Sequence, residues 1–420
     1  MDAFRVTGGN RLVGELSVAG AKNAALPLLA ATLLTDGPCR IDRMPELADV
    51  QTMCSLLCEL GVAVKQENRR AVTLQASGLS TCEAPYELVK TMRASILVLG
   101  PLLARMGEAR VSLPGGCAIG ARPIDLHLEG LTRMGAEVTV EHGYVVVKAK
   151  RLKGCRLYLD FPTVTGTMNL MMAATLADGV TVIENAACEP EVTDLVHFLT
   201  AMGARIDGAG SDRLVVEGVR ELCGASHAMI PDRIEAGTLL LAGAITRGDV
   251  TVTHVVPEHL EALIQKLREV GVVVDVTADR IRVRANGRLK AVNVRTLPHP
   301  GFPTDLQAQM MALLAISDGM GIVTETIFES RFTHVAELVR MGADIHLEGQ
   351  NAIITGVDQL SGAEVMASDL RASAGLVLAG LVADGDTWIR RIYHLDRGYE
   401  RLEEKLEALG ASVSRVSAPL

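Results

Sequence analysis

The sequence predicts an α/β protein of two domains, each built from three copies of one repeat. Two observations predict this class. The chain has 420 residues, more than one ordinary hydrophobic core accommodates. In addition, Leu-x-x-x-Gly followed by a run of alternating β-branched residues recurs six times, at Gly61, Gly135, Gly203, Gly271, Gly342 and Gly410. Six repeats in 420 residues divide naturally into two domains of ordinary size.

The spacing of these glycines defines the repeat. Successive intervals are 74, 68, 68, 71 and 68 residues. Each repeat also has an earlier Ala/Leu-rich segment that ends in Gly and leads into a strand-like run. The predicted order is therefore helix, Gly, strand, helix, Gly, strand, turn, strand, with each Gly at the left-handed position that ends a helix.

The two helices of a repeat differ in their apolar pattern. The first is apolar nearly all round, so we expect it to be buried. The second is amphipathic and should keep one face in water; in the first repeat its apolar positions are Leu47, Val50, Met53, Leu57 and Leu60. The segment 4–6 reads as a strand without a partner in its own repeat, and we expect it to pair with the C-terminal half.

Composition excludes several functional classes. Aromatic residues are only 3% of the chain and the net charge is −9, which argues against a nucleic-acid surface. We find no secretory signal and no apolar run long enough to span a membrane, so we expect a cytoplasmic protein. Cys54 and Cys58 are one helical turn apart on an apparently buried face, which favours core packing with reduced thiols over a metal site.

Cations stand where the buried helices begin. Lys22, Arg93 and Arg371 lie at predicted helix N-termini, which carry partial positive charge and favour anions. A bound phosphate or carboxylate would resolve this conflict, and ion pairs between repeats or surface exposure are the alternatives. Asp305 lies at the start of another such helix, where physical reasoning alone favours a role in capping or neutralising the helix N-terminus.

The segment 113–123 is the other unusual feature. It reads LPGGCAIGARP, with three Gly and two Pro, and is typical of an irregular loop. A Cys in such a loop should be accessible, and Arg122 near Cys117 can favour the thiolate or place an anionic substrate beside it. The alternative is that Cys117 is an incidental small residue.

Six segments carry a family resemblance. They are GAKNAALP (20–27), YELVKTMRAS (86–95), LPGGCAIGARPIDLH (113–127), NVRTLPHPGFPTDLQAQ (293–309), ETIFESRF (325–332) and IYHLDRGYERLEEKL (392–406). With these segments the chain resembles the UDP-N-acetylglucosamine 1-carboxyvinyltransferase (MurA) family of enolpyruvyl transferases, within the EPSP synthase superfamily. The resemblance implies the enolpyruvyl transferase fold, an inside-out α/β barrel in which buried helices are surrounded by sheets and each repeat is of βαβαββ type. It also implies a discontinuous domain of residues 1–21 plus 231–420, an inserted domain of residues 22–230, and an active site between them.

The implied reaction is an addition followed by an elimination. The 3-hydroxyl of UDP-N-acetylglucosamine (UDP-GlcNAc) adds to C2 of phosphoenolpyruvate (PEP), and phosphate then leaves, in the first committed step of peptidoglycan synthesis. This chemistry needs an acid, a base and anion binding. No metal or other cofactor is implied, and neither is a nucleic acid, a membrane or an obligate protein partner.

The resemblance also implies roles for individual residues. Cys117 would be the proton donor, able to form a covalent adduct with PEP and to be alkylated by fosfomycin. Asp305 would contact the sugar hydroxyl and act as base. Lys22 and Arg397 would also be catalytic. PEP would be bound by Lys22, Asn23, Arg93, Arg122, Arg371 and Arg397. UDP-GlcNAc would be bound by Arg93, Arg122, Pro123, Ile124, Asp125, Leu126, His127, Thr163, Val164, Asp305 and Ile327.

Two departures and two alternatives remain at this stage. Some family members carry Lys at the position of Phe161, so here the nucleotide diphosphate would have to be held by Arg122 and backbone N–H groups. Some carry Trp at the position of Leu97, where we expect little functional effect. One alternative is an EPSP synthase-like transferase with a different acceptor, against which the Pro-Gly-Gly-Cys loop counts. The other is an inactive UDP-sugar-binding paralogue, against which the joint presence of Lys22, Cys117, Asp305 and Arg397 counts.

Overall fold

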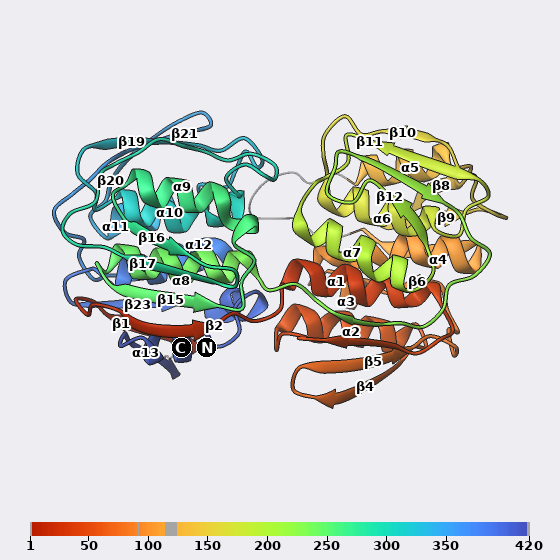
Figure 1. The fold of residues 1–420 in the computed structure, drawn as a ribbon, viewed down its shortest axis with the longest axis horizontal. Helices are drawn as coiled ribbons and strands as arrows, with labels where there is room; N and C mark the ends of the chain where they lie inside the picture. The colour runs from red at the N-terminus through yellow and green to blue at the C-terminus, as the bar shows by residue number, and fades with distance from the viewer. Residues whose placement is uncertain (1, 91, 114–123, 418–420) are drawn as a thin grey trace. The chain divides into compact units, whose positions relative to one another are not determined.

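The computed structural model describes residues 2–90, 92–113 and 124–417, which form two compact units (Figure 1). Unit 1 comprises the described residues of 2–19 and 231–417, and unit 2 comprises those of 20–230. None of the helices in the described ranges combines the length and apolarity that crossing a membrane requires.

The third repeat of unit 2 shows the βαβαββ topology that the sequence predicts. Its strands form one sheet in the order β10-β11-β13-β12, in which β10 is parallel to β11 and β13 is antiparallel to both of its neighbours. The elements in chain order are β10 (Arg156–Tyr158), α6 (Val164–Ala174), β11 (Val180–Glu184), α7 (Pro190–Ala201), β12 (Arg205–Asp207) and β13 (Arg213–Glu217).

The other two repeats of unit 2 follow the same plan. The second has the sheet order β6-β7-β9-β8 and consists of β6 (Glu83–Ala84), α3 (Tyr86–Val89), η2 (Arg93–Val98), α4 (Leu99–Met106), β7 (Glu108–Ser112), α5 (Asp125–Arg133), β8 (Glu137–Glu141) and β9 (Tyr144–Lys148). In the first repeat the initial strand comes from the far end of the unit, so the order is β14-β3-β5-β4. Its elements are α1 (Lys22–Ala31), η1 (Thr32–Leu34), β3 (Cys39–Asp42), α2 (Ala48–Glu59), β4 (Ala63–Asn68), β5 (Ala71–Gln75) and β14 (Ser226–Ala228).

Unit 1 contains the remaining three repeats. The first two have the sheet orders β16-β17-β15-β2 and β18-β19-β21-β20. The first consists of β2 (Val13–Ser17), α8 (Arg233–Ile245), β15 (Asp249–Thr253), η3 (Pro257–Leu260), α9 (Glu261–Glu269), β16 (Val273–Val276) and β17 (Arg280–Arg284). The second consists of β18 (Val294–Arg295), η4 (Thr304–Leu306), α10 (Gln307–Leu314), β19 (Met320–Thr324), α11 (Val335–Arg340), β20 (Asp344–Glu348) and β21 (Asn351–Thr355).

The last repeat of unit 1 takes its final strand from the N-terminus. The sheet order is β22-β23-β1-β24, and Phe4 of β1 lies opposite Ile389 of β23 and Arg415 of β24, both antiparallel. This confirms the expected pairing of the N-terminal strand with the C-terminal half. The elements are β22 (Glu364–Met366), α12 (Leu370–Gly380), β23 (Asp386–Arg390), η5 (Ile392–Arg397), α13 (Leu402–Ala408), β24 (Ser412–Ser417) and β1 (Asp2–Thr7).

The six repeat glycines occupy the backbone conformation that the sequence predicts. Their φ angles lie between 92° and 102°, in the left-handed region, directly after each amphipathic helix. A side chain with a Cβ atom is strained there, so glycine is favoured at this position for a local reason that recurs with the repeat.

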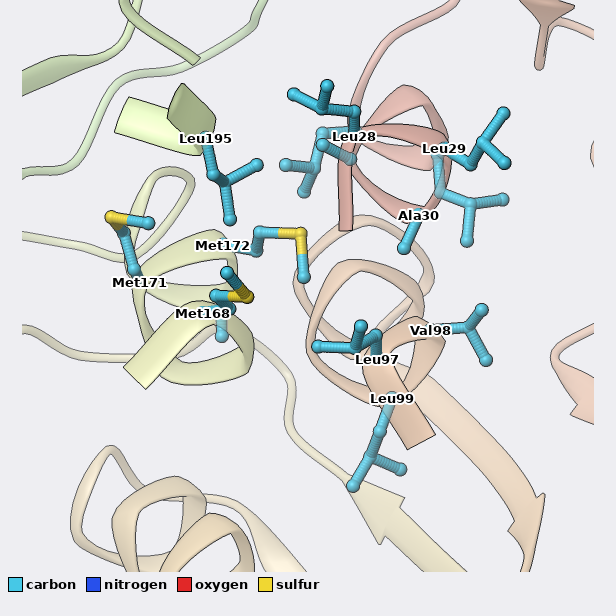
Figure 2. Close-up of a cluster of buried hydrophobic side chains, with 14 of the residues drawn as sticks. Leu28, Leu29, Ala30, Leu97, Val98, Leu99, Met168, Met171, Met172 and Leu195 are labelled. Atoms are coloured by element: carbon cyan, nitrogen blue, oxygen red, sulfur yellow. The ribbon is translucent and has the colours of Figure 1, made fainter. Parts of the chain in front are cut away.

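Buried helices form the core of each unit. All residues of α8 and α10 are buried, and α1, α6 and α12 are nearly as fully enclosed, which confirms the predicted burial in these five repeats. In the second repeat α4 is buried over Leu99–Leu103 only, and its end at Met106 is exposed. In unit 2, Leu, Val, Ala and Met side chains from α1, α6 and the η2–α4 segment pack together with Leu195 of α7 (Figure 2). Some of these helices approach closely. A Cβ on Gly375 of α12 would lie 2.9 Å from backbone atoms of Ala308 in α10.

The amphipathic helix α2 confirms one prediction and corrects another. Val50, Met53 and Leu57 are buried, as are Leu47 and Leu60 at the two ends of the helix. The placement of Cys54 and Cys58 on a buried face is wrong for Cys58, which is exposed, while Cys54 is half-buried. These two residues lie at the edge of the apolar stripe, so the one-turn spacing carries Cys58 into solvent.

Candidate active site

Asp305 is held by two arginines from different parts of unit 1. Its Oδ1 accepts a hydrogen bond from Nη2 of Arg331 at 2.8 Å, and its Oδ2 accepts one from Nε of Arg371 at 3.2 Å. The side chains of Arg331 and Arg371 are 7% and 2% exposed, and that of Asp305 is 24% exposed. No side-chain cap is present at the start of η4 or α10, so Asp305 does not cap a helix. It is instead an acidic residue in the first turn of η4, and its carboxylate is paired with arginines.

These arginines determine the charge state of Asp305. Burial alone would raise the pKa of the carboxyl group, but the charges of Arg331 and Arg371 outweigh it and hold the pKa well below its usual value. Asp305 is therefore ionised at neutral pH and can accept a hydrogen bond from a substrate hydroxyl. The same pairing makes it a weak proton acceptor while both arginines remain in place.

Arg331 is a site residue to which the sequence analysis assigns no role, although it lies in the quoted segment 325–332. Its Nη1 donates to the hydroxyl of Thr304 at 2.8 Å, which ties it to the turn that carries Asp305. Thr304 in turn donates to Glu325 Oε2 at 2.9 Å. The sequence offered one signal for this role, a cation within a family-like segment. Its pairing with Asp305, 26 residues away, is determined by the tertiary fold.

Arg371 is the predicted anion ligand whose surroundings are most completely described. It is the second residue of α12, where Asp369 caps the helix by accepting from the N–H groups of Arg371 and Ala372, both at 2.9 Å. Its guanidinium lies 5.1 Å from the centroid of the Tyr399 ring. Neither terminal nitrogen, Nη1 nor Nη2, meets hydrogen-bond geometry with any residue that the structure describes.

Lys22 is buried as well and lies at the start of α1. Its Nζ is 2.8 Å from Oδ2 of Asp49 in α2, and the two side chains are 8% and 5% exposed. An ion pair therefore accommodates the cation at this helix N-terminus, but it forms within one repeat and not between repeats as the alternative expected. Asn23, the next residue of α1, is half-buried.

In unit 2, a buried histidine lies near the start of α6. Nδ1 of His127 in α5 accepts from Nδ2 of Asn169 at 3.0 Å, which leaves Nε2 to carry the proton toward the hydroxyl of Thr165 at 3.4 Å. Burial, assisted by the positive charge of Arg93, lowers the pKa of His127 to about 4. His127 is therefore a neutral side chain that supports the starts of these helices.

The other predicted UDP-GlcNAc residues of unit 2 lie at helix starts. The Thr163 hydroxyl caps α6 by accepting from the N–H of Gly166 at 3.3 Å, and Val164, the first residue of the helix, is half-buried. Ile124 precedes α5 and is buried, Asp125 is exposed and Leu126 is half-buried. Phe161, which replaces a lysine of some family members, is 44% exposed, and Leu97 is buried in η2.

Two further predicted residues lie in unit 1. The N–H of Ile327 donates to Oε1 of Glu325 at 2.8 Å, and Ile327 itself is half-buried. Glu325 is 1% exposed and also accepts from the hydroxyls of Thr296 and Thr304, so it orders the segment before Ile327. Arg397 is half-buried at the end of η5.

Cys117, Arg122 and Pro123 lie outside the described residues, so their expected roles stay predictions. Within the described ranges, a hydrogen bond joins Asp305 to Arg371, and the charge of Arg93 acts on His127. No group of three or more His, Cys, Asp or Glu side chains in those ranges has the arrangement of a metal site.

A separate cavity of about 650 Å³ lies on unit 1, between α9 and the β18–β21 sheet. Lys266, Arg295, Phe302 and Asn351 are among the residues that line it, and it includes none of the predicted site residues. The cavity is open to solvent and its charged side chains lie at the surface. It therefore contains no buried charge cluster like the one around Asp305.

Comparisons with known proteins agree along the full chain. Residues 6–406 match the family described as EPSP synthase (3-phosphoshikimate 1-carboxyvinyltransferase). A UDP-N-acetylglucosamine 1-carboxyvinyltransferase from Magnetococcus marinus is 58% identical over 417 residues, covering 99% of this chain and 100% of the relative.

Solved structures show the same fold. The enolpyruvyl transferase NikO from Streptomyces tendae superposes with a TM-score of 0.90 at 28% identity, covering 100% of this chain and 99% of that chain. An EPSP synthase from Acinetobacter baumannii superposes with a TM-score of 0.77 at 19% identity, covering 99% and 100%. The predicted fold class, three βαβαββ repeats per unit with buried helices, is thereby confirmed.

Proposed function

This chain belongs to the EPSP synthase (3-phosphoshikimate 1-carboxyvinyltransferase) family, and from that premise we propose that it transfers the enolpyruvyl group of PEP to the 3-hydroxyl of UDP-GlcNAc. The observation that carries the proposal is the end-to-end identity of 58% with a relative of that activity, against 19% with an EPSP synthase. The chain is accordingly a UDP-N-acetylglucosamine 1-carboxyvinyltransferase, acting in peptidoglycan synthesis.

The reaction requires one proton to be donated and one to be accepted. As the sugar oxygen adds to C2 of PEP, C3 gains a proton and the hydroxyl loses its own. Loss of a proton from C3 and departure of phosphate then give the enolpyruvyl ether. We propose that Cys117 donates the first proton and that Asp305 receives the hydrogen bond of the sugar hydroxyl.

The two arginines at Asp305 suggest how its basicity is controlled. An aspartate paired with Arg331 and Arg371 is ionised but weakly basic. We propose that the anionic groups of PEP draw Arg371 into new hydrogen bonds, which weakens its hold on Asp305 and raises the pKa of the carboxyl group toward its usual value. Proton acceptance would then follow substrate binding.

The remaining roles are proposed as the family resemblance implies them. Lys22, Asn23, Arg93, Arg122 and Arg397 would bind PEP with Arg371, and the residues 122–127, Thr163, Val164 and Ile327 would bind the sugar nucleotide. These residues are divided between the two units, so the proposal requires both units for one reaction. We further propose that the protein acts in the cytoplasm, with no cofactor or macromolecular partner in the reaction.

The test compares two acceptors. Purified protein is mixed with PEP and either UDP-GlcNAc or shikimate 3-phosphate, and inorganic phosphate is followed with time. Release with UDP-GlcNAc alone is the expected result, and release with shikimate 3-phosphate alone would establish the EPSP synthase reaction instead. Folded protein that binds UDP-GlcNAc but releases no phosphate with either acceptor would be an inactive sugar-nucleotide-binding paralogue.

A further inference from the structure

Tyr399 is a buried residue of unit 1 that has no role in the proposed mechanism. It follows η5 and is 2% exposed, yet its ring lies beside the guanidinium of Arg371, 5.1 Å from Cζ to the ring centroid. Burial alone would lower the pKa of the guanidinium, but the charge of the Asp305 carboxylate outweighs it and holds the pKa above its usual value. The cation is thus stabilised inside the core of unit 1.

The Tyr399 hydroxyl is fixed by two other buried helices. Thr238 of α8 already donates its only hydroxyl proton to the carbonyl of Ile234 at 2.8 Å, so the Tyr399 O–H donates to Thr238 Oγ1 at 2.9 Å. Nε2 of Gln309 in α10 then donates to the Tyr399 oxygen at 3.0 Å. The ring is therefore held at its edge and has little freedom to turn away from Arg371.

The same network reaches Asp305. Nε2 of Gln309 also lies 3.1 Å from the backbone carbonyl oxygen of Asp305. Tyr399 is consequently connected to both members of the Arg371–Asp305 pair, to the guanidinium through its ring and to the Asp305 backbone through Gln309.

The kind of contact matters for what Arg371 can still bind. A carboxylate partner would occupy N–H donors of the guanidinium, whereas an aromatic face attracts the cation and consumes none of them. Nε of Arg371 is occupied by Asp305, and both terminal nitrogens remain without a hydrogen-bond partner among the described residues. Buried donors of this kind are costly unless a ligand satisfies them.

We propose that Tyr399 is a positioning residue that holds the Arg371 guanidinium against its ring, with the two terminal nitrogens left available for an anionic group of the substrate. The inference rests on the proposed function for the identity of that anion, the phosphate or carboxylate of PEP. Tyr399 itself touches no reacting atom and acts through Arg371.

The test uses two variants and a matched control. Tyr399→Leu removes both the ring and the hydroxyl, and Tyr399→Phe keeps the ring while releasing it from Thr238 and Gln309. Tyr393→Leu is the control, because Tyr393 lies in η5, a few residues away, and is 50% exposed. Thermal unfolding identifies any variant that fails to fold. If Tyr399→Leu fails to fold, the measurements are made on Tyr399→Phe alone.

The first readout needs no activity. In ¹⁵N-labelled protein, the Nε–H signal of Arg371, identified by its absence in Arg371→Lys, should be sharp and slow to exchange in the unmodified protein and in Tyr393→Leu. It should broaden or exchange rapidly in Tyr399→Leu and to a smaller extent in Tyr399→Phe. An unchanged signal in both folded Tyr399 variants would overturn the inference.

The second readout separates positioning from a general loss of structure. KM for PEP should rise about tenfold in Tyr399→Leu, the scale of a lost desolvated cation–π contact, while KM for UDP-GlcNAc stays constant. Equal rises in both KM values would contradict a role through Arg371. If the unmodified protein releases no phosphate from PEP and UDP-GlcNAc, the proposed function fails, and the Arg371 signal still decides the positioning role.

Discussion

Nε of Arg371 donates a hydrogen bond to Oδ2 of Asp305 across 3.2 Å, joining residues 66 positions apart in the chain. Asp305 lies in η4, at the start of one buried helix segment, and Arg371 lies at the start of α12 in the next repeat. Arg331 donates a hydrogen bond to the other carboxylate oxygen of Asp305. The repeat architecture thus brings together charges that no local pattern connects, and the ionised state of Asp305 depends on that meeting.

Replacing Asp305 by Asn should change how stability depends on pH. The pKa of Asp305 is lowered in the folded protein, so the unfolded chain binds the proton first. The stabilisation is present above about pH 4, the ordinary pKa of Asp, and is lost as the pH falls below it. Urea unfolding from pH 7 to pH 3 should therefore show a shallower acid decline for Asp305→Asn than for the unmodified protein.

The control for this experiment is Asp358→Asn. Asp358 also pairs with an arginine, Arg288, but its side chain is 94% exposed. This variant should follow the unmodified protein across the pH range. Parallel curves for Asp305→Asn and the unmodified protein would show that the arginine pair does not hold the carboxylate ionised.

Replacing Asp49 by Asn should destabilise unit 2. The change leaves the charge of Lys22 buried without its carboxylate, and losing one partner of a buried pair costs about 3 to 5 kcal/mol. Denaturant unfolding measures the loss. Glu67→Gln, which breaks the exposed Lys65–Glu67 pair, should leave the unfolding free energy nearly unchanged, and an equally small effect of Asp49→Asn would contradict the prediction.

Replacing Arg93 by Met should raise the pKa of His127 from about 4 toward, but not up to, its ordinary value of 6.5. Burial is the larger cause of the lowered pKa and remains, while the repulsion from Arg93 is removed. Because this pKa is depressed, protonation below pH 6.5 favours the unfolded chain. Ring ¹⁵N shifts of His127 followed from pH 8 to pH 4 give the titration. An identical His127 titration in the variant would exclude a contribution from Arg93.

Replacing Cys117 by Ala should lower turnover about 10²- to 10⁴-fold at neutral pH, because the proposed acid is removed. Cys117→Asp should retain activity, since a carboxyl group can also donate a proton, and should resist fosfomycin. Phosphate release with and without the drug measures both effects. Near-normal turnover of Cys117→Ala, or inactivation of Cys117→Asp by fosfomycin, would remove Cys117 from the proposed role.

The features that the sequence predicts correctly are local or periodic. Gly271 and its five counterparts end helices in a conformation that glycine favours for steric reasons, and a helix such as α8 is apolar on every face and must be buried. Because the same features recur in each repeat, six weak signals together give one strong prediction of the repeat architecture. The pairing of β1 could also be anticipated, because a strand without a local partner must find a distant one.

The contacts around the candidate site depend on tertiary structure and escape such reasoning. Asp305 resembles a helix cap from its position, yet its partners are Arg331 and Arg371. The cation of Lys22 is balanced by Asp49, which lies in the next helix and reads as an ordinary first-turn acid. Tyr399 follows no periodic pattern, and its importance emerges only from the three buried helices it touches.

The pairing of β1 with β23 and β24 has a consequence for how the protein is made. The polypeptide leaves the ribosome N-terminus first, so β1 is synthesised long before its partner β24, which ends at Ser417. At about 5 to 20 residues per second, this strand waits roughly 20 to 80 seconds for its neighbours. The described residues of unit 2 all lie between Gly20 and Ile230 and can fold during that interval, whereas the last sheet of unit 1 can close only after β24 has been synthesised.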